Sequence, residues 1–183
     1  VFLALLAVVC AAPAARSEER MVGLSGKPLP RFETLRFNTV NGFAGPSKDH
    51  QLRWQYTRKG LPVVVVAETE TWRQIVDPDG EKVWVPRGQL LSQAGTAVVR
   101  GEASVPLYAR AQGKGRVRAL VDPGVIVLVR GCEGNWCAVK IDKRKGFIAQ
   151  DTLWGLGTPP VEPSPVPIGL AIRADETGAH PSS

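Results

Sequence analysis

An internal repeat of about 64 residues constrains the fold of this chain more than any other feature of its sequence. Three pairs of apolar residues stand at nearly one offset: Trp72 and Trp136 (64 residues apart), Ile75 and Val139 (64), and Val85 and Ile148 (63). Several matches at one offset rarely arise by chance, so we interpret the chain as a duplication. We name the two copies unit one, residues 31–92, and unit two, residues 93–156.

Each unit has the pattern of short β-strands. Runs rich in Val, Ile and Trp alternate with turn sequences, of which Pro78-Asp79-Gly80 most clearly marks a hairpin. No window keeps a 3.6-residue apolar period long enough for a substantial helix. The 19 Gly and 15 Pro among 183 residues also favour many turns. We therefore predict an all-β protein made of two small, strongly bent barrels in tandem.

The two ends of the chain differ in composition from the units. Residues 1–12 are apolar and uncharged, and the small residues Ala12 and Ala14 follow the spacing that a signal peptidase reads, so we predict a signal peptide at 1–15. Twelve residues span only about 18 Å as a helix, too short for a membrane. Residues 157–183 begin with a proline-rich run, which predicts a disordered tail. We expect a periplasmic or otherwise exported protein with no stable membrane span once it is processed.

Export changes the meaning of the three cysteines. Cys10 leaves with the signal peptide, which leaves Cys132 and Cys137 as an even pair in an oxidising compartment. A zinc site is the rival interpretation, but it would need the distant His50 and His180 as further ligands. We predict a disulfide, with no metal and no cofactor.

Positive charge gathers in unit two. Its ten basic and five acidic residues give +5, whereas nine basic and seven acidic residues give unit one +2. Two sets of cations are candidates for an anion-binding patch, the first on one strand face and the second at a hairpin tip: Lys114, Arg116 and Arg118, then Lys143, Arg144 and Lys145. The alternative is an ordinary solvated surface. Export makes nucleic acid an unsuitable partner.

Aromatic residues offer a second set of candidates. Trp72 and Trp136 hold equivalent positions in the two units, which indicates duplicated packing, with a ligand platform as the alternative. A further set, less constrained by the repeat, combines rings with bases and suits a sugar or a peptide: Arg53, Trp54, Tyr56 and Arg58, beside Lys59. The alternative for that set is a solvated strand face.

Catalytic residues are scarce. His50 lies beside Asp49, but no Ser or Cys motif accompanies it. Five carboxylates crowd one hairpin, where a glycosidase pair is conceivable, although acids at turns are usually solvated: Glu68, Glu70, Asp77, Asp79 and Glu81. The sequence therefore favours a protein that is not an enzyme.

Several of these segments together resemble a known domain family. Unit one combines Val40-Asn41-Gly42-Phe43-Ala44-Gly45-Pro46 with Gly60-Leu61-Pro62-Val63 and the Trp-x-x-Ile and Gly-x-x-x-Trp-Val steps, and this combination resembles a bacterial SH3-like domain. Unit two is similar at Leu107-Tyr108-Ala109-Arg110, Pro123-Gly124-Val125 and Gly146-Phe147-Ile148. The family pattern usually has Arg where Phe43 stands and Asn where Pro106 stands.

The resemblance implies two tandem SH3-like barrels and a binding role. Two such domains behind a signal peptide resemble exported SH3-domain proteins of Gram-negative bacteria. We therefore expect a non-catalytic binding module of the cell envelope that recognises peptidoglycan or an envelope protein. The alternative is a structural or adaptor protein with only protein partners, and a cell-wall hydrolase comes third.

Overall fold

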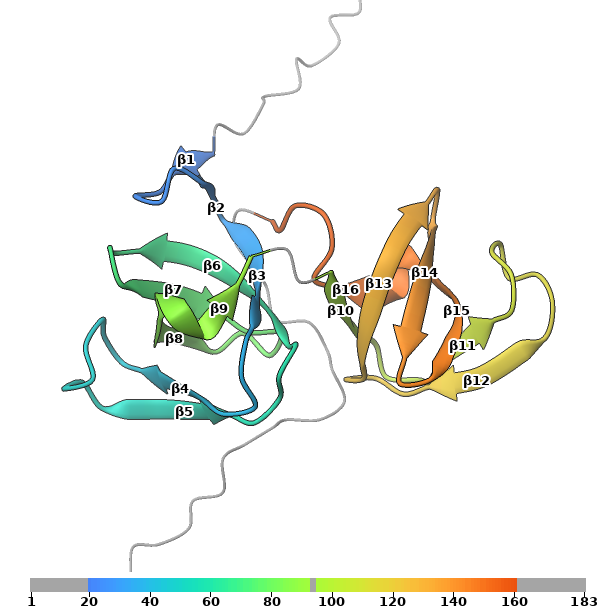
Figure 1. Ribbon diagram of the computed structural model, residues 1–183, viewed down its shortest axis with the longest axis horizontal. Coiled ribbons are helices and arrows are strands. Elements are labelled where there is room, and N and C mark those ends of the chain that lie inside the picture. The colour runs from blue at the N-terminus through green and yellow to red at the C-terminus, as the bar shows by residue number, and fades with distance from the viewer. Residues whose placement is uncertain (1–19, 93–94, 161–183) are drawn as a thin grey trace, which may run out of the picture.

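The computed structural model describes residues 20–92 and 95–160, which form two antiparallel seven-stranded sheets and one short hairpin (Figure 1). The all-β prediction is confirmed. Several parts of the sequence interpretation lie outside the described residues: the predicted signal peptide, Cys10, residues 161–183 of the predicted tail, and Gln93 and Ala94 at the start of unit two. None of the described helices is long and apolar enough to cross a membrane.

The first sheet is built from unit one and has the strand order β5-β4-β8-β7-β6-β3-β9. A small hairpin precedes it and a single 3₁₀ turn interrupts it, and the bounds are β1 Met21–Val22, β2 Pro28–Leu29, β3 Arg31–Leu35, β4 Val40–Phe43, β5 Leu52–Tyr56, β6 Pro62–Glu68, β7 Trp72–Val76, β8 Lys82–Pro86, η1 Arg87–Gln89 and β9 Leu90–Leu91.

The second sheet is built from unit two and repeats that order as β12-β11-β15-β14-β13-β10-β16. Its bounds are β10 Thr96–Val99, β11 Val105–Tyr108, β12 Val117–Val121, β13 Ile126–Glu133, β14 Trp136–Ile141, β15 Arg144–Ala149, η2 Gln150–Thr152 and β16 Leu153–Trp154. The predicted duplication therefore extends to strand order.

Strand register repeats as well as strand order. Phe43 on β4 pairs with Trp84 on β8, and the matching pair in unit two is Tyr108 on β11 with Phe147 on β15. The β6–β7 ladder shifts register after Val65, as the β13–β14 ladder does after Val129. Such bulges add local twist, which helps a short sheet to curve around its own core.

Each sheet encloses its own apolar core, because alternate residues along a strand point inward. In unit one the core residues on three adjacent strands are fully buried valines and isoleucine: Val63, Val65, Ile75, Val83 and Val85. In unit two the corresponding residues include Val127, Cys137, Val139 and Ile148. Burying each such aliphatic side chain stabilises the fold by roughly 1.5–3 kcal/mol.

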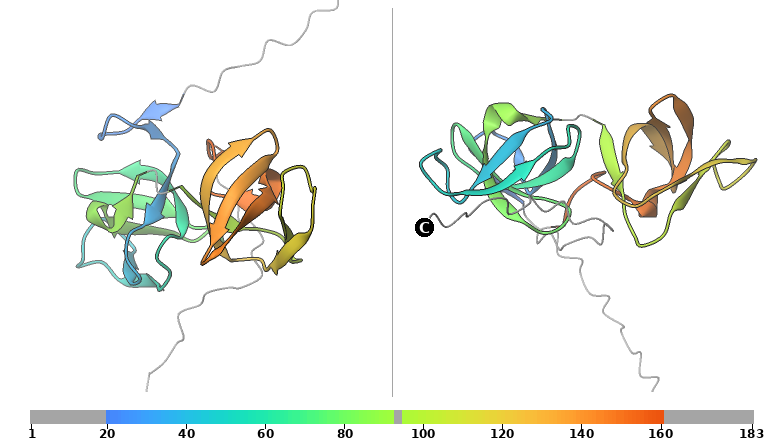
Figure 2. Two further views of the ribbon diagram at one scale, coloured as in Figure 1. Left: turned by 45° about the vertical axis from the view of Figure 1, so that its right-hand side comes forward. Right: turned by 90° about the horizontal axis from the view of Figure 1, so that it is seen from below.

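A third apolar cluster joins the two units. Val64 and Val76 lie on the outer face of unit one and contact Val98 and Trp154 of unit two. The Trp154 ring meets the Phe32 ring edge-to-face at 5.0 Å between centroids. Figure 1 shows β10 and β16, two strands of the second sheet, on the side of that sheet nearest unit one, and Figure 2 shows the two units side by side. The units therefore pack on one another directly.

Two expectations need correction. The bases at Lys114 and Arg116 do not extend one face of a strand, because β12 begins only at Val117 and the residues before it form turns with Gly113 and Gly115 at positive φ. The first residues of the predicted tail also pack on the protein: Pro159 is buried, and its carbonyl accepts a hydrogen bond from Arg20.

Candidate functional site

The outer face of β14 and β15 brings aromatic and basic side chains of unit two together. Alternation buries Cys137, Val139 and Ile148 on the inner face. The outer face carries three cross-strand pairs: Trp136 with Ala149, Ala138 with Phe147, and Lys140 with Lys145. Aromatic residues lie toward one end of this face and bases toward the other.

The aromatic end is a groove of about 790 Å³, which we call the Trp136 groove. Trp136, Ala138 and Phe147 line it, and the loop after β11 borders it through Ala111 and Gln112. The Tyr108 ring supports the Trp136 ring edge-to-face at 5.6 Å between centroids. These half-buried rings offer apolar faces to a ligand.

Gly113 lies in the border loop beside these rings. Its φ is +66°, and a Cβ atom there would lie at ordinary contact distance, 3.6 Å from the Trp136 ring and 3.7 Å from the Tyr108 ring. Glycine adopts this left-handed backbone conformation without strain. The loop therefore closes one side of the Trp136 groove.

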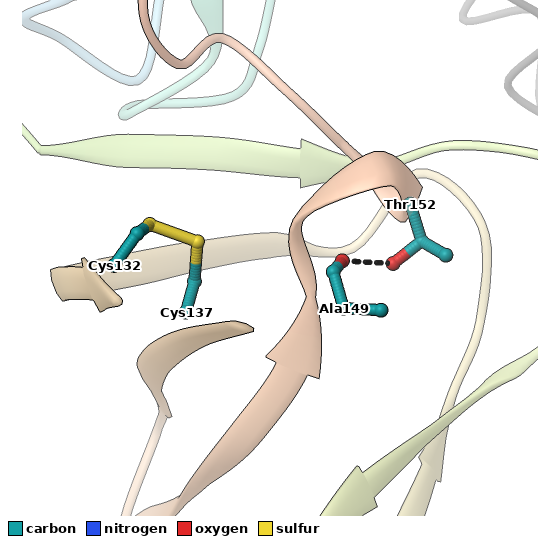
Figure 3. The surroundings of a disulfide bond; sticks show 4 residues. All are labelled: Cys132, Cys137, Ala149 and Thr152. Carbon is teal, nitrogen blue, oxygen red and sulfur yellow. Dashed lines mark hydrogen bonds between the residues drawn. A yellow bond between two sulfur atoms is a disulfide. The ribbon is translucent and has the colours of Figure 1, made fainter. Parts of the chain in front are cut away.

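The predicted disulfide joins Cys132 and Cys137 at the other side of this groove (Figure 3). The two residues face each other across the β13–β14 ladder, with 4.0 Å between their Cα atoms. Figure 3 also shows the Thr152 hydroxyl donating to the Ala149 carbonyl at 2.7 Å, where β15 turns into η2. The covalent bond fixes the hairpin from which Trp136 projects.

The basic end of the face is a second hollow, of about 600 Å³, which we call the cationic patch. It is lined by five of the six bases singled out from the sequence, around Val117: Arg116, Arg118, Lys143, Arg144 and Lys145. Arg118 Nη1 donates to the Lys145 carbonyl at 2.6 Å, which links β12 to β15. Lys114 does not line this hollow.

The groove and the patch lie on one continuous surface. Lys145 lines the patch and Phe147 lines the groove, and they are alternate residues of the same strand. Alternate residues of a strand point to the same face and stand about 6.8 Å apart. A ligand of modest size therefore reaches both regions at once.

The second predicted set does not form a site. Tyr56 lies in the core of unit one, 3% exposed, and its hydroxyl donates to Asp77 Oδ2 at 3.2 Å. Trp54 points to the same side and packs against that core. Arg58 donates to the Gly124 carbonyl of unit two, so of these four residues only Arg53 is exposed, as is the neighbouring Lys59. Alternation in β5 explains the difference, because it places both rings on the inner face.

Two of the five carboxylates considered for catalysis, Glu68 and Asp77, are held by internal contacts. Glu68 is bound by arginines, and Asp77 Oδ1 accepts the backbone N–H groups of Asp79 and Glu81 at 2.9 Å each. Burial raises the pKa of Asp77 to about 6 despite these hydrogen bonds. His50 lies against Gly45 in an exposed loop. Over residues 20–92 and 95–160, no three His, Cys, Asp or Glu side chains are placed to hold a metal.

Unit one presents a related set of rings. Phe43 meets Trp72 edge-to-face at 5.7 Å, as Tyr108 meets Trp136 in unit two. The sequence pointed to both tryptophans but not to Tyr108. The offset of 65 residues between Phe43 and Tyr108 was the available signal. The ring pair is thus a property of the repeated fold, and the adjoining cationic patch distinguishes unit two.

Comparison with known protein families agrees with the repeated fold. A family model for the bacterial SH3 domain matches residues 37–91 and 101–155. Among solved structures, NlpC2 from Trichomonas vaginalis is similar at 12% identity with a TM-score of 0.32, over 68% of this chain and 47% of that one. NlpC1 from the same organism is similar at 12% identity with a TM-score of 0.33, over 76% and 48%.

The chain thus spans about half the length of those two proteins. No curated protein sequence matches it. The two family matches together cover more than half of the 183 residues, and each falls on one of the two sheets. The chain belongs to the bacterial SH3 domain family and carries two copies of the domain in tandem.

Proposed function

We propose that this protein is an exported, non-catalytic binding module of the cell envelope, and that the outer face of unit two recognises peptidoglycan or an envelope protein. Bacterial SH3 domains are generally binding modules, which supports the general role. One observation carries the choice of surface: the Trp136 groove and the cationic patch adjoin along β15, through Phe147 and Lys145.

Peptidoglycan fits such a surface by its chemistry. Sugar rings stack their apolar faces on aromatic side chains, and the stem peptides carry carboxylates that attract bases. Exposed charges are screened over about 8 Å at physiological salt, so the patch contributes an attraction that weakens as salt rises. The groove supplies the part of the binding that salt affects little.

Co-sedimentation with purified sacculi tests the proposal. The Trp136→Ala variant should bind at least about tenfold more weakly, because a hot-spot aromatic contributes about 1.4 kcal/mol or more. Trp72→Ala is the matched control, because it removes the equivalent ring from unit one. Equal losses in the two variants, or no loss in either, would contradict the assignment to unit two.

A protein partner is the other outcome of the same design. A pulldown from envelope extract that retains one protein, with sacculi left unbound, would favour the adaptor role. Trp136→Ala should then weaken that capture. Degradation of sacculi by the pure protein would overturn the non-catalytic assignment.

A further inference from the structure

A second pocket of about 790 Å³ lies on unit one, remote in sequence from the unit-two surface. It is formed where the β1–β2 hairpin, β3, the β6–β7 turn and η1 meet. Five of its lining residues are cations and only two are carboxylates: Lys27, Arg31, Arg36, Arg73 and Arg87, with Glu33 and Glu70. Such an excess of positive charge attracts anions.

The base of this pocket is a buried ion cluster. Arg31 donates through Nε to Glu33 and through Nη2 to Glu68, each at 2.8 Å. Glu68 also binds Arg73 Nε at 3.1 Å, and the Glu68 side chain is 1% exposed. Its Oε1 accepts the Ser25 backbone N–H at 2.6 Å. Glu33 and Glu68 are therefore already engaged within the protein, and of the carboxylates named here only Glu70 on the rim is not.

One hydrogen-bonding group of this cluster has no partner. Arg31 Nη1 is buried and donates to no atom within the described part of the chain. A buried guanidinium N–H without an acceptor is costly, and most such groups in folded proteins are paired. Arg31 lines the pocket, so an acceptor that enters it arrives beside this side chain.

The rim adds further charge. The exposed Arg36 and Arg87 form no ion pair within residues 20–92 and 95–160. The Arg36 backbone N–H donates to the Gln89 carbonyl at 2.8 Å, and this bond ties the end of β3 to η1, the turn that carries Arg87. Lys27, which also lines the pocket, donates to the Ser92 hydroxyl at 2.7 Å. The rim thus carries cations that the protein itself does not neutralise.

We propose that this pocket binds an oxyanion, a carboxylate or phosphate group carried on a larger molecule. Arg31 Nη1 donates to one oxygen, and Arg36, Arg87 and Lys27 neutralise the charge. Guanidinium groups match the geometry of both oxyanions. A volume near 790 Å³ leaves room for the molecule that carries the group.

Unit two lacks this arrangement and provides an internal comparison. Strand register places Cys132 and Cys137 where unit one has Glu68 and Arg73. By the same alignment, Gly95 and Ala97 replace Arg31 and Glu33. The inference therefore concerns unit one alone and does not depend on the unit-two surface.

Nuclear magnetic resonance of the full chain in a low-salt buffer tests the inference. One arm titrates inorganic phosphate and the other titrates N-acetylglycine, which offers a single carboxylate. We expect a saturable shift of the Arg31 Nε–H resonance in at least one arm. A response to phosphate alone identifies a phosphate ligand, and a response to N-acetylglycine alone identifies a carboxylate ligand.

Variants assign the response to the pocket. The double variant Arg36→Gln/Arg87→Gln changes only the exposed rim and should weaken binding roughly 2- to 25-fold. Arg31→Lys keeps a charge but removes the unpartnered N–H, and should weaken it at least about tenfold. The matched control Arg100→Gln/Arg110→Gln makes the same charge change on unit two and should have less than about a twofold effect.

Three results would overturn the inference: no saturable shift in either arm, a control that weakens binding as much as the rim variant, or a rim variant with unchanged affinity. If Arg31→Lys does not fold, the rim variant and its control still decide. A failure here leaves the sacculus experiment on unit two unaffected.

Discussion

Two glycines, Gly42 and Gly146, occupy opposite sides of the same packing contact in the two units. A Cβ atom on Gly42 would lie 2.5 Å from Val83 Cγ2, and one on Gly146 would lie 2.7 Å from Leu107 Cδ1. Leu107 is the unit-two counterpart of Gly42, and Gly146 is the counterpart of Val83. The small and the large partner therefore stand on opposite strands in the two units, and in each unit the large side chain fills the space beside the glycine.

This exchange predicts that a second substitution restores stability after a glycine is replaced in unit one, but not in unit two. Gly42→Ala should cost about 1–3 kcal/mol of the free energy of unfolding through overpacking, and Val83→Ala should recover part of that loss in the double variant. Gly146→Ala should resist rescue by Leu107→Ala, because its Cβ would also lie 2.6 Å from the Tyr108 carbonyl oxygen. Urea unfolding of the unchanged protein, the four single variants and the two double variants measures both couplings. Equal rescue in the two units would contradict the backbone explanation.

Asp77 gives the protein a specific dependence on pH. Burial raises its pKa from 3.8 to about 6 in the folded protein. The folded state then holds this proton more tightly than the unfolded chain. The stability contributed by Asp77 is fully present below about pH 4 and is lost as pH rises through 6, a total of about 3 kcal/mol.

We predict that Asp77→Asn removes most of the decrease in the free energy of unfolding between pH 4 and pH 7.5. The Asn side-chain oxygen still accepts the two backbone N–H groups, and its amide donates to the Tyr56 hydroxyl. Urea unfolding at pH 5 and pH 7.5 is the measurement. Hydrogen bonds from Ser25 and Arg31 overcome the effect of burial and lower the pKa of Glu68 to about 2, so Glu68 does not titrate in this window. A variant as pH-dependent as the original protein would refute the assignment.

The β6–β7 and β13–β14 hairpins are equivalent, but different interactions stabilise them at the same pair of positions: an ion pair in unit one and a disulfide in unit two. Glu68 faces Arg73 across β6 and β7, and Cys132 faces Cys137 across β13 and β14. The sequence predicted the cysteine pair, because two thiols close together in an exported chain favour a disulfide. It did not predict the ion pair, because Glu68 depends on Arg31, 37 residues away in the chain. The same carboxylate was expected to be a solvated turn residue.

The two means should differ in their contribution to stability. Removing one partner of a buried ion cluster leaves uncompensated charge, so Glu68→Ala should cost about 3–5 kcal/mol. Replacing both cysteines by alanine opens only a small loop and should cost about 2 kcal/mol. Denaturant unfolding of both variants measures the order. A larger loss in the cysteine variant would show that the ion cluster contributes little.

Strand patterns predicted each barrel but not the contact between the barrels. Val63 to Val66 form a continuous apolar run, which is typical of a strand buried on both faces. Val63 and Val65 fill the core of unit one, whereas Val64 lies in the junction with Val98 and Trp154. A repeat predicts two similar domains, but the surfaces that join them differ between the copies. Lys140, for example, stands in unit two where Val76 stands in unit one.

The junction should make the two units unfold as one. Trp154 is 8% exposed and contacts Phe32 of the other unit, so Trp154→Ala should cost about 3–5 kcal/mol and split one calorimetric transition into two. Trp154 also contacts its own barrel, so its loss does not test the junction alone. Val76→Lys tests the junction more directly, because it places a charge there. Unit two already has a lysine, Lys140, at the equivalent register position, so the barrel itself should accept the change. Lys140→Ala on the outer face is the control and should leave a single transition. Two transitions in the unchanged protein, or one unshifted transition in Val76→Lys, would show that the units are independent.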